Sequence, residues 1–339
     1  MEGKKKISFI LAIYNAERTL QECLEGIIQQ SYPKNKYEII IVDGGSTDKT
    51  LSIIKAFTKH YGKQVSIRFI HNKHRLSEGK GMGKDQGVAA SHGEYICFLD
   101  HDNILFGKNW IQTMLYPLET NKEVAASQSM LHFKQEDPAF LKYVNAVGVE
   151  DAFAIPYSLV AQVVLHPERF KLLHNAYYFY LPRPERVLYG GANGCMFRKE
   201  VFAKIGSYTR DVNVSASMAD HKLAFAVVKD AFIHHKTVTD FFTFVKKKEL
   251  YFYRFVSFGY KEENFRWVGH TFRDKINFYL MVIGNLILIL HIFEGIRLAS
   301  KKREVFWLLH PFYIWVMTVL YICISLVKIK HYTKYVHAK

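Results

Sequence analysis

An acidic triplet, Asp100-His101-Asp102, is the strongest candidate for chemistry in this sequence. Two carboxylates one residue apart can bind a hard divalent cation with one or two oxygens and leave coordination sites for phosphate and water. A cation held in this way stabilises the negative charge that builds on a departing diphosphate. The triplet alone also fits a solvated turn that includes Asn103. Its position directly after the apolar run Tyr95–Leu99 favours the metal site.

The elements that must position this triplet follow an alternating pattern. Short apolar runs predict strands that are buried on both faces, and amphipathic stretches predict helices between them. The predicted strands are 7–13, 38–42, 65–71 and 95–99, and the predicted helices are 16–30, 51–57 and 83–91. This order indicates an α/β fold with a mostly parallel sheet and helices on both faces. Ligands of such sheets bind beyond the carboxyl ends of the strands, where Tyr14, Asn15, Asp43 and Asp100 all lie.

Composition limits the other classes of function. The 339 residues suffice for one catalytic domain with an appendage. The four cysteines show no Cys-x-x-Cys spacing, so neither a zinc cage nor a disulfide framework is predicted. The net charge of +15 is densest near the C-terminal apolar segments, and no nucleic-acid-binding motif is present. This distribution favours membrane and phosphate partners over nucleic acid.

Two apolar segments, 276–293 and 305–327, mark the C-terminal third. The second is long enough to cross a bilayer, which needs about 20 residues, whereas the first is marginal. Lys301–Arg303 and the pair Lys328 and Lys330 bracket the second segment, as interfacial anchors do. A spanning, re-entrant or interfacial hairpin and a pair of buried core helices all remain open. The basic N-terminus lacks a signal-peptide pattern, which predicts a catalytic part on the cytoplasmic side of the cell membrane.

The ordered motifs resemble the inverting glycosyltransferases of family 2, which have the GT-A fold. The resemblance covers about residues 5–255 and rests on 13–17 (Ile-Tyr-Asn-Ala-Glu), 41–48 (Ile-Val-Asp-Gly-Gly-Ser-Thr-Asp) and the long stretch 83–102. It implies a glycosyltransferase domain over 1–265, with a donor half to about 105 and an acceptor half from 106. A membrane-associated helical hairpin would then occupy 270–330.

The resemblance also implies which residues contact the donor. The implied donor-binding residues are Ile13, Tyr14, Asn15, Glu17, Asp43, Gly45, Lys84, Asp100 and His101. Asp43 would accept a hydrogen bond from the uracil N3–H, but the family commonly has a second aspartate where this chain has Gly44. A strand-end turn without a ligand role is the alternative for Asp43. Lys84 would lie near the diphosphate, and an exposed helix lysine is its alternative.

The implied metal is Mn2+ or Mg2+, bound by Asp102, by Asp100 through water, and by His235. An inverting transfer also needs a base that takes the acceptor proton. The family places this base in an acidic pair at a helix start after a glycine turn, and Asp220 is assigned to it, with Ala219 in place of the usual Glu. His221 is a possible substitute, and the alternative for Asp220 is the N-cap of a helix over 222–229.

Together these features predict an enzyme that transfers one sugar from a nucleoside-diphosphate sugar, with UDP preferred, to a membrane-held acceptor such as polyprenyl phosphate or a lipid-linked glycan. Lys246–Lys248 and Arg254 fit a basic amphipathic helix on lipid head groups or diphosphate, or a solvated face. The alternative function is a non-catalytic nucleotide-sugar-binding scaffold. An oxidoreductase is disfavoured because the glycines at 81–87 follow the third strand rather than the first.

Overall fold

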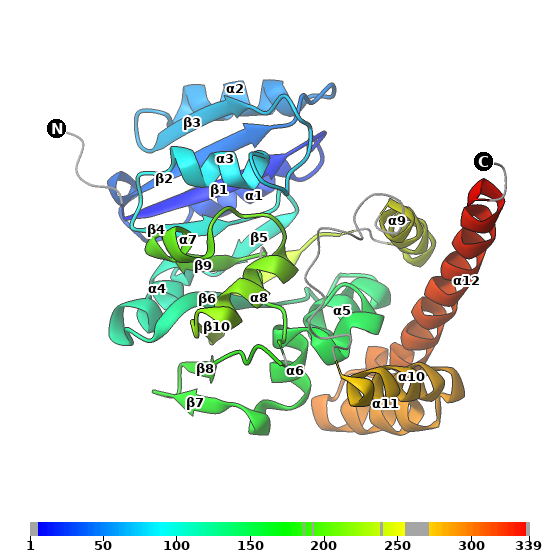
Figure 1. The fold of residues 1–339 in the computed structure, drawn as a ribbon. Coiled ribbons are helices and arrows are strands. Elements are labelled where there is room, and N and C mark those ends of the chain that lie inside the picture. Colours follow the sequence, from blue (N-terminus) through cyan, green and yellow to red (C-terminus); the bar gives the residue numbers. More distant parts are fainter. Residues whose placement is uncertain (1–5, 186, 192, 238–239, 255–270, 337–339) are drawn as a thin grey trace.

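One mixed β-sheet organises the computed structural model, which describes residues 6–185, 187–191, 193–237, 240–254 and 271–336, with backbone only at 251–254 and 328–336. Among these residues the sheet has ten strands in the order β3-β2-β1-β4-β9-β6-β10-β8-β7, and β5 pairs with β10 (Figure 1). The sheet continues without a break past residue 105, where the donor half was predicted to end. The predicted α/β class is confirmed.

The N-terminal part is the predicted parallel sheet. Its strands β1 (Ile7–Ile13), β2 (Tyr37–Asp43), β3 (Ser66–His71) and β4 (Tyr95–Phe98) pair in parallel, and β1 and β2 are buried along their whole length. The connecting helices are α1 (Leu20–Ile28), α2 (Thr50–Tyr61) and α3 (Gly83–Ala90). Helix α1 begins four residues later than predicted, because Asn15 has a positive φ of 49° and the residues after it form a turn.

The following part widens the sheet with antiparallel strands. Strand β9 (Cys195–Arg198) lies between β4 and β6 (Val124–Leu131) and is antiparallel to both. The long strand β10 (Ala224–His235) pairs with β6, β5 (Asn103–Phe106) and β8 (Tyr177–Tyr180), and β7 (Lys171–Leu173) forms the edge. The helices here are α4 (Trp110–Thr120), α5 (Ala139–Val147), α6 (Leu159–Leu165), α7 (Glu200–Ile205) and α8 (Asp211–Asp220).

The predicted helix over 222–229 is wrong, because β10 occupies most of that range. Lys222, with φ of +54°, follows the end of α8 and reverses the chain into the strand. Residues 224–228 are all buried, since both faces of this central strand are covered. A strand buried on both faces has no alternation of polar and apolar residues, so its apolar run resembles that of a buried helix.

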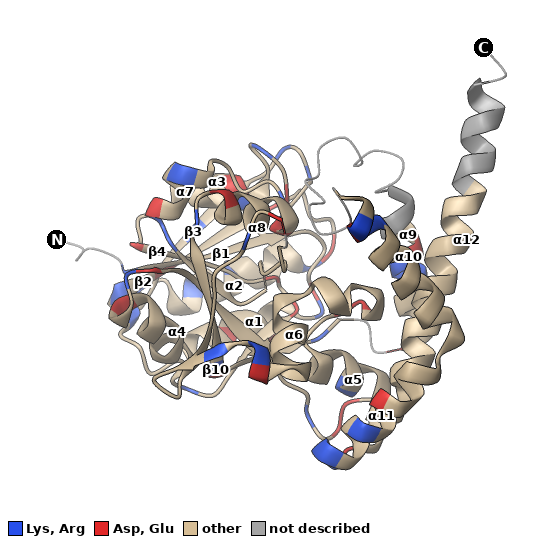
Figure 2. Cartoon of the chain, turned by 60° about the horizontal axis from the view of Figure 1, so that its bottom comes forward, with Lys and Arg blue, Asp and Glu red and all other residues tan. Residues whose placement is uncertain are grey.

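Among residues 271–336, three helices rather than the predicted pair are present. Helix α9 (Phe241–Arg254) precedes them, and α10 (Phe272–Ile287) and α11 (Ile289–Lys302) meet at 72°, where Leu288 has φ of +66°. A short 3-10 turn, η5 (Val305–Leu309), leads into α12 (His310–Val336). The segment Val305–Val327 is long and apolar enough to cross a membrane. The helices lie to one side of the sheet, and α12 carries no charged residue along its coloured length (Figure 2).

Candidate active site

Two loops at the carboxyl ends of β1 and β2 hold each other through reciprocal hydrogen bonds. Asn15 donates its backbone N–H to Ser46 Oγ at 2.9 Å, and its Oδ1 accepts from Thr47 N at 2.8 Å. Glu17 Oε2 accepts from Lys49 N at 3.0 Å. Asn15 and Glu17, both predicted to contact the donor, therefore join the two loops that border the strand-end edge.

The Asp43 carboxylate stabilises a turn at the end of β2, which was the alternative to a contact with the nucleobase. Its Oδ2 accepts from the backbone N–H groups of Gly45 and Ser46, each at 3.0 Å, and its Oδ1 accepts from the Ser46 hydroxyl. With 1% of its surface exposed, the carboxylate is enclosed by its own loop. The hydrogen bonds of the Asp43 carboxylate are thus those of a strand-end turn, and its contact with uracil stays a prediction. Gly45 has φ of +82° and allows the chain to turn. The Ile13 side chain is buried, and its backbone carbonyl accepts a hydrogen bond from Gly44 N at 2.8 Å.

Gly44 is explained by the neighbouring loop that carries Arg75. A Cβ added at position 44 would lie 2.9 Å from the Arg75 carbonyl oxygen, so only glycine fits. The Arg75 guanidinium lies 4.3 Å from the centre of the Tyr14 ring and donates a hydrogen bond to its hydroxyl. Where the resemblance led us to expect a second aspartate, this chain has a close backbone approach and an exposed cation. Arg75 was not predicted from the sequence, because no periodic or motif signal marks its loop.

The Lys84 side chain is buried, so the alternative interpretation of Lys84 as an exposed helix lysine is wrong. It lies in the first turn of α3 with 2% of its surface exposed. Its Nζ lies 2.9 Å from Glu78 Oε1, 3.5 Å from Asp100 Oδ1 and 5.3 Å from the Tyr208 ring centre. Burial favours the neutral amine, but the surrounding carboxylates outweigh it and raise the pKa of Lys84 above its usual value. The charged ammonium is therefore held at the edge of the triplet.

The triplet and His235 come together although they lie far apart in sequence. Asp102 Oδ2 lies 3.4 Å from His235 Nε2, and Asp102 Oδ1 accepts from Asn103 Nδ2 at 3.1 Å. Burial alone would raise the pKa of Asp102, but the neighbouring His235 lowers it; the same pairing raises the pKa of His235 against the effect of burial. His101 Nδ1 lies 2.8 Å from Thr19 Oγ1, the residue just before α1.

Strand geometry separates the two adjacent histidines of β10. Successive side chains of a strand point to opposite faces. His235 faces Asp102, whereas His234 Nε2 lies 2.9 Å from Asp137 Oδ2. Of these two histidines, His235 is the one placed to bind the same metal ion as the triplet.

Asp102 and His235 fit a divalent cation. Adjacent ligands of one ion, each about 2.1 Å from it, lie roughly 3 Å apart, close to the observed 3.4 Å between Asp102 Oδ2 and His235 Nε2. The Asp100 side chain is one-third exposed and faces Lys84, so it can act through water. A carboxylate and an imidazole accept Mn2+, and oxygen ligands accept Mg2+.

Asp220 cannot be the base of this site, and the prediction is wrong. It is the exposed last residue of α8, at the start of β10, whereas His235 is the last residue of that twelve-residue strand. At about 3.3 Å per residue, and allowing for the irregularities in β10, the two lie roughly 30 Å apart. The N-cap alternative fails as well, because Asp220 ends a helix. His221 is exposed, with Nδ1 2.8 Å from Ser217 O, and is equally remote.

Asp211, the first residue of α8, occupies the place that Asp220 was expected to fill. Tyr208 donates its hydroxyl to Asp211 Oδ1. A Cβ at Gly191 would lie 2.7 Å from Asp211 Cβ, so the glycine turn admits this side chain. Burial raises the pKa of Asp211 to about 6, with a further contribution from Glu78, while Lys84 opposes the rise. The available signal was its position: after the glycine turn, the acidic residues that begin a helix are Glu200 of α7 and Asp211 of α8, and Asp211 is the second of them.

A second charged cluster approaches the site from α9. Lys247 and Lys248 place Nζ atoms 2.8 and 2.6 Å from the two carboxylate oxygens of Glu150. Burial would raise the pKa of Glu150, but these lysines hold it well below its usual range. Part of the predicted basic stretch is therefore paired and not a solvated face. Arg254, predicted with it, lies outside the described side chains.

Comparisons with known proteins define the class and the family. The mannosyltransferase PcManGT of Pyrobaculum calidifontis, solved with GDP-Man and Mn2+, matches 94% of this chain and 88% of its own, with a TM-score of 0.55 at 13% identity, which shows a shared GT-A-type fold. The family model for glycosyl transferase family 2 matches residues 8–206, and the chain belongs to this family. The predictions of fold and family are confirmed.

Curated relatives resemble the N-terminal part. The poly(ribitol-phosphate) beta-glucosyltransferase of Bacillus spizizenii is 33% identical over 144 residues, which are 42% of this chain and 20% of the relative. Glycosyltransferase GlyG of Streptococcus pneumoniae is 31% identical over 139 residues, 41% of this chain and 44% of the relative. The matched region thus spans less than half the length of either relative.

Proposed function

We propose that this chain transfers one sugar, with inversion, from a nucleoside-diphosphate sugar to an acceptor hydroxyl. The observation that carries the proposal is the cluster that joins Asp211, Lys84 and Asp100, in which a half-buried carboxyl of raised pKa lies near the acidic triplet. Family membership supports the reaction class. A scaffold that only binds nucleotide-sugar would not need a base tuned in this way.

The reaction is a single in-line displacement. The acceptor oxygen forms a bond to the anomeric carbon while the bond from that carbon to the diphosphate oxygen breaks, and the acceptor proton passes to Asp211. The nucleoside diphosphate leaves with the bonding electron pair. Lys84 contributes positive charge near the leaving group, and Tyr208 orients Asp211 through its hydroxyl.

Asp102 and His235 would hold Mn2+ or Mg2+, with Asp100 acting through water. When bound, the ion supplies charge stabilisation for the diphosphate. The ion in PcManGT supports a divalent metal in this fold. Because the Asp43 carboxylate bonds to its own loop and Gly44 replaces the second aspartate, we propose a nucleoside-diphosphate sugar without assigning the base.

The acceptor side is proposed to lie at a membrane, with the catalytic part on the cytoplasmic side. Large apolar side chains are exposed on α10 and α11, among them Tyr279, Ile283, Leu290 (74% exposed) and Phe293. Contact with lipid would remove this apolar surface from water at about 25 cal/mol per Å2. An interfacial placement of α10 and α11 next to the apolar segment Val305–Val327 suits an acceptor such as polyprenyl phosphate or a lipid-linked glycan.

A transfer assay tests the proposal. Full-length protein in vesicles is incubated with a panel of nucleoside-diphosphate sugars and a lipid extract, with Mn2+, with Mg2+ or after chelation. We expect metal-dependent release of nucleoside diphosphate and a glycosylated lipid of inverted anomeric configuration. Asp102→Asn should lose metal-dependent turnover, whereas full turnover in this variant would contradict the metal assignment. Donor binding without transfer to any extract would favour the scaffold.

A further inference from the structure

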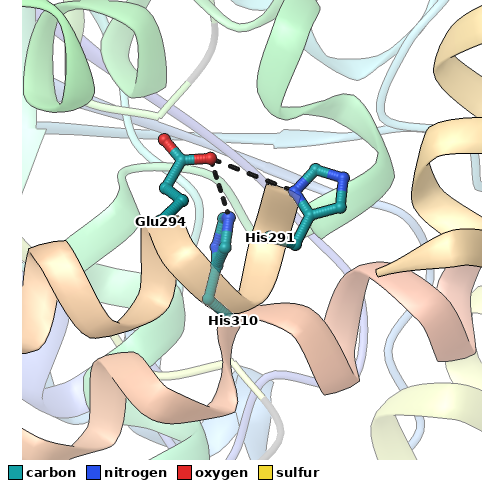
Figure 3. A group of neighbouring side chains, drawn as sticks. All are labelled: His291, Glu294 and His310. Carbon is teal, nitrogen blue, oxygen red and sulfur yellow. Dashed lines mark ion pairs between the residues drawn. The ribbon is translucent and has the colours of Figure 1, made fainter. Parts of the chain in front are cut away.

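A second cluster of ligand-type side chains lies in the C-terminal helices, away from the triplet. His291 and Glu294 project from α11, and His310 begins α12 (Figure 3). Glu294 Oε2 lies 3.4 Å from His310 Nε2 and 3.9 Å from His291 Nδ1, and the three ligand atoms lie within 4.8 Å of one another. The family match ends at residue 206, so this group lies outside it.

The outer nitrogen of each imidazole is held by a hydrogen-bonding partner. Asn285 Nδ2 donates to Thr318 Oγ1 at 3.0 Å, and Thr318 donates its own proton to Ile314 O at 2.8 Å. Because the Asn285 amide nitrogen is used in this way, its Oδ1 is free to accept a hydrogen bond from His291 Nε2 at 3.0 Å. A neutral His291 that donates through Nε2 carries its lone pair on Nδ1, the atom that faces Glu294.

His310 is arranged in a similar way. Its Nδ1 lies 2.7 Å from the Tyr143 hydroxyl, and its side chain is 1% exposed. His310 Nε2 and His291 Nδ1 are both buried and have no hydrogen-bond partner. Buried polar atoms that make no hydrogen bond are rare and costly. These two nitrogens face Glu294 Oε2 at 3.4 and 3.9 Å, so all three atoms point to a place where a cation could bind.

The group opens into a cavity of about 240 Å3. Besides the three ligand-type residues, polar side chains of His166, Arg169 and Gln162 line it. The cavity has room for water or a small anion next to the cluster. A bound ion would therefore keep an open coordination position.

We propose that His291, Glu294 and His310 bind a divalent d-block cation, Zn2+ in the first place. Two imidazole nitrogens and one carboxylate oxygen are a ligand set that Zn2+ uses, with an open fourth position. Tetrahedral ligands about 2.1 Å from an ion lie roughly 3.4 Å apart, which matches the pair at 3.4 Å and approaches the pair at 3.9 Å. Hydrogen-bonded outer nitrogens are the usual support of such ligands.

The ion would join two parts of the molecule. It would bridge α11 to the start of α12, and Tyr143 of α5 would link His310 to the part of the chain that holds the sheet. The site goes beyond the proposed transfer reaction and does not depend on it, because none of its residues contacts the triplet among the described interactions.

Zinc binding by the full-length protein in detergent tests the proposal. After chelation and addition of Zn2+, elemental analysis following dialysis should find one tightly held equivalent in the wild type and in Asp102→Asn, which removes the other metal site. His310→Ala and His291→Ala should weaken Zn2+ binding at least about 100-fold. Co2+ in place of Zn2+ should give a visible d–d absorption in the wild type that these variants lack.

Two further variants keep the test decisive. Glu294→Gln preserves the shape of the side chain, so loss of Zn2+ with unchanged helical circular dichroism separates lost ligation from misfolding. His174→Ala removes an exposed histidine next to β7 and should leave Zn2+ binding unchanged. Retention of Zn2+ in all three ligand variants, or its loss in Asp102→Asn, would overturn the proposal. Failure of the wild type to hold Zn2+ would show that the cluster is an ion pair only.

Discussion

Lys84 and Asp100 form a close charge pair, with 3.5 Å between Nζ and Oδ1, in which the lysine side chain is only 3% exposed. The pair connects helix α3 to the triplet. Because Glu78 and Asp211 also act on this one ammonium, three carboxyls depend on a single buried cation. The loss of any member should therefore change the others.

Removal of the proposed base should abolish turnover without abolishing donor binding. Asp211→Asn keeps the size of the side chain but cannot accept the acceptor proton. We expect kcat to fall by about 10²–10⁴-fold, the usual contribution of general base catalysis, while the donor Kd measured by calorimetry stays within a few-fold. Asp220→Asn is the matched control, since that residue is exposed and remote. Equal losses in the two variants would refute the assignment.

The pH dependence of the reaction should report Asp211. A base acts in its deprotonated form, so a pKa of about 6 predicts that kcat/KM rises with pH through about 6 and reaches a plateau above it. Initial rates between pH 5 and 8, at saturating metal, would check this. A profile without an inflection in that range would exclude Asp211 as the titrating base.

Replacement of the buried lysine should cost stability. Lys84→Met leaves Glu78 and Asp100 without their cation; because both carboxylates are about one-third exposed, we expect a loss of about 2 kcal/mol, below the 3–5 kcal/mol of a fully buried pair. Urea unfolding would measure it. The double variant with Glu78→Gln should recover part of the loss, and additive losses would show that the two residues are not coupled.

Restoring the residue expected from the family at position 44 should harm this chain. In Gly44→Asp the new Cβ would meet the Arg75 carbonyl oxygen at 2.9 Å, and overpacking of this kind costs about 1–3 kcal/mol. Thermal unfolding of Gly44→Asp against Gly284→Ala provides the measurement, because a Cβ at Gly284 meets nothing within 4 Å. An increase in stability or in uridine binding would contradict the explanation.

The N-terminal sheet could be predicted because its determinants are local. Strands β1, β2 and β4 are short apolar runs that end at polar turns, and the signal does not depend on distant contacts. The same reasoning failed at β10, which packs against α4 and α6, two helices far away in sequence. The break at Leu288 was also hidden, because a left-handed leucine leaves no trace in an apolar pattern.

The candidate site was predicted only where it depends on strand ends. The triplet follows β4 directly, and the expectation that His235 meets Asp102 agrees with the geometry. The base was misplaced because Asp211 and Asp220 belong to one helix, and only the tertiary arrangement shows that its first residue faces Lys84. Arg75 was missed for a related reason: its contact with Tyr14 joins loops 61 residues apart.

The paired loops that begin at Asn15 and Ser46 have a consequence for engineering. Each loop satisfies backbone groups of the other, so a loop grafted alone from another family member would leave unpaired N–H groups on both sides. Chimeras that exchange both loops together should fold, whereas single exchanges should not. The two loops therefore depend on each other for folding. Changes of donor preference in this chain are expected to require coordinated substitutions in both loops.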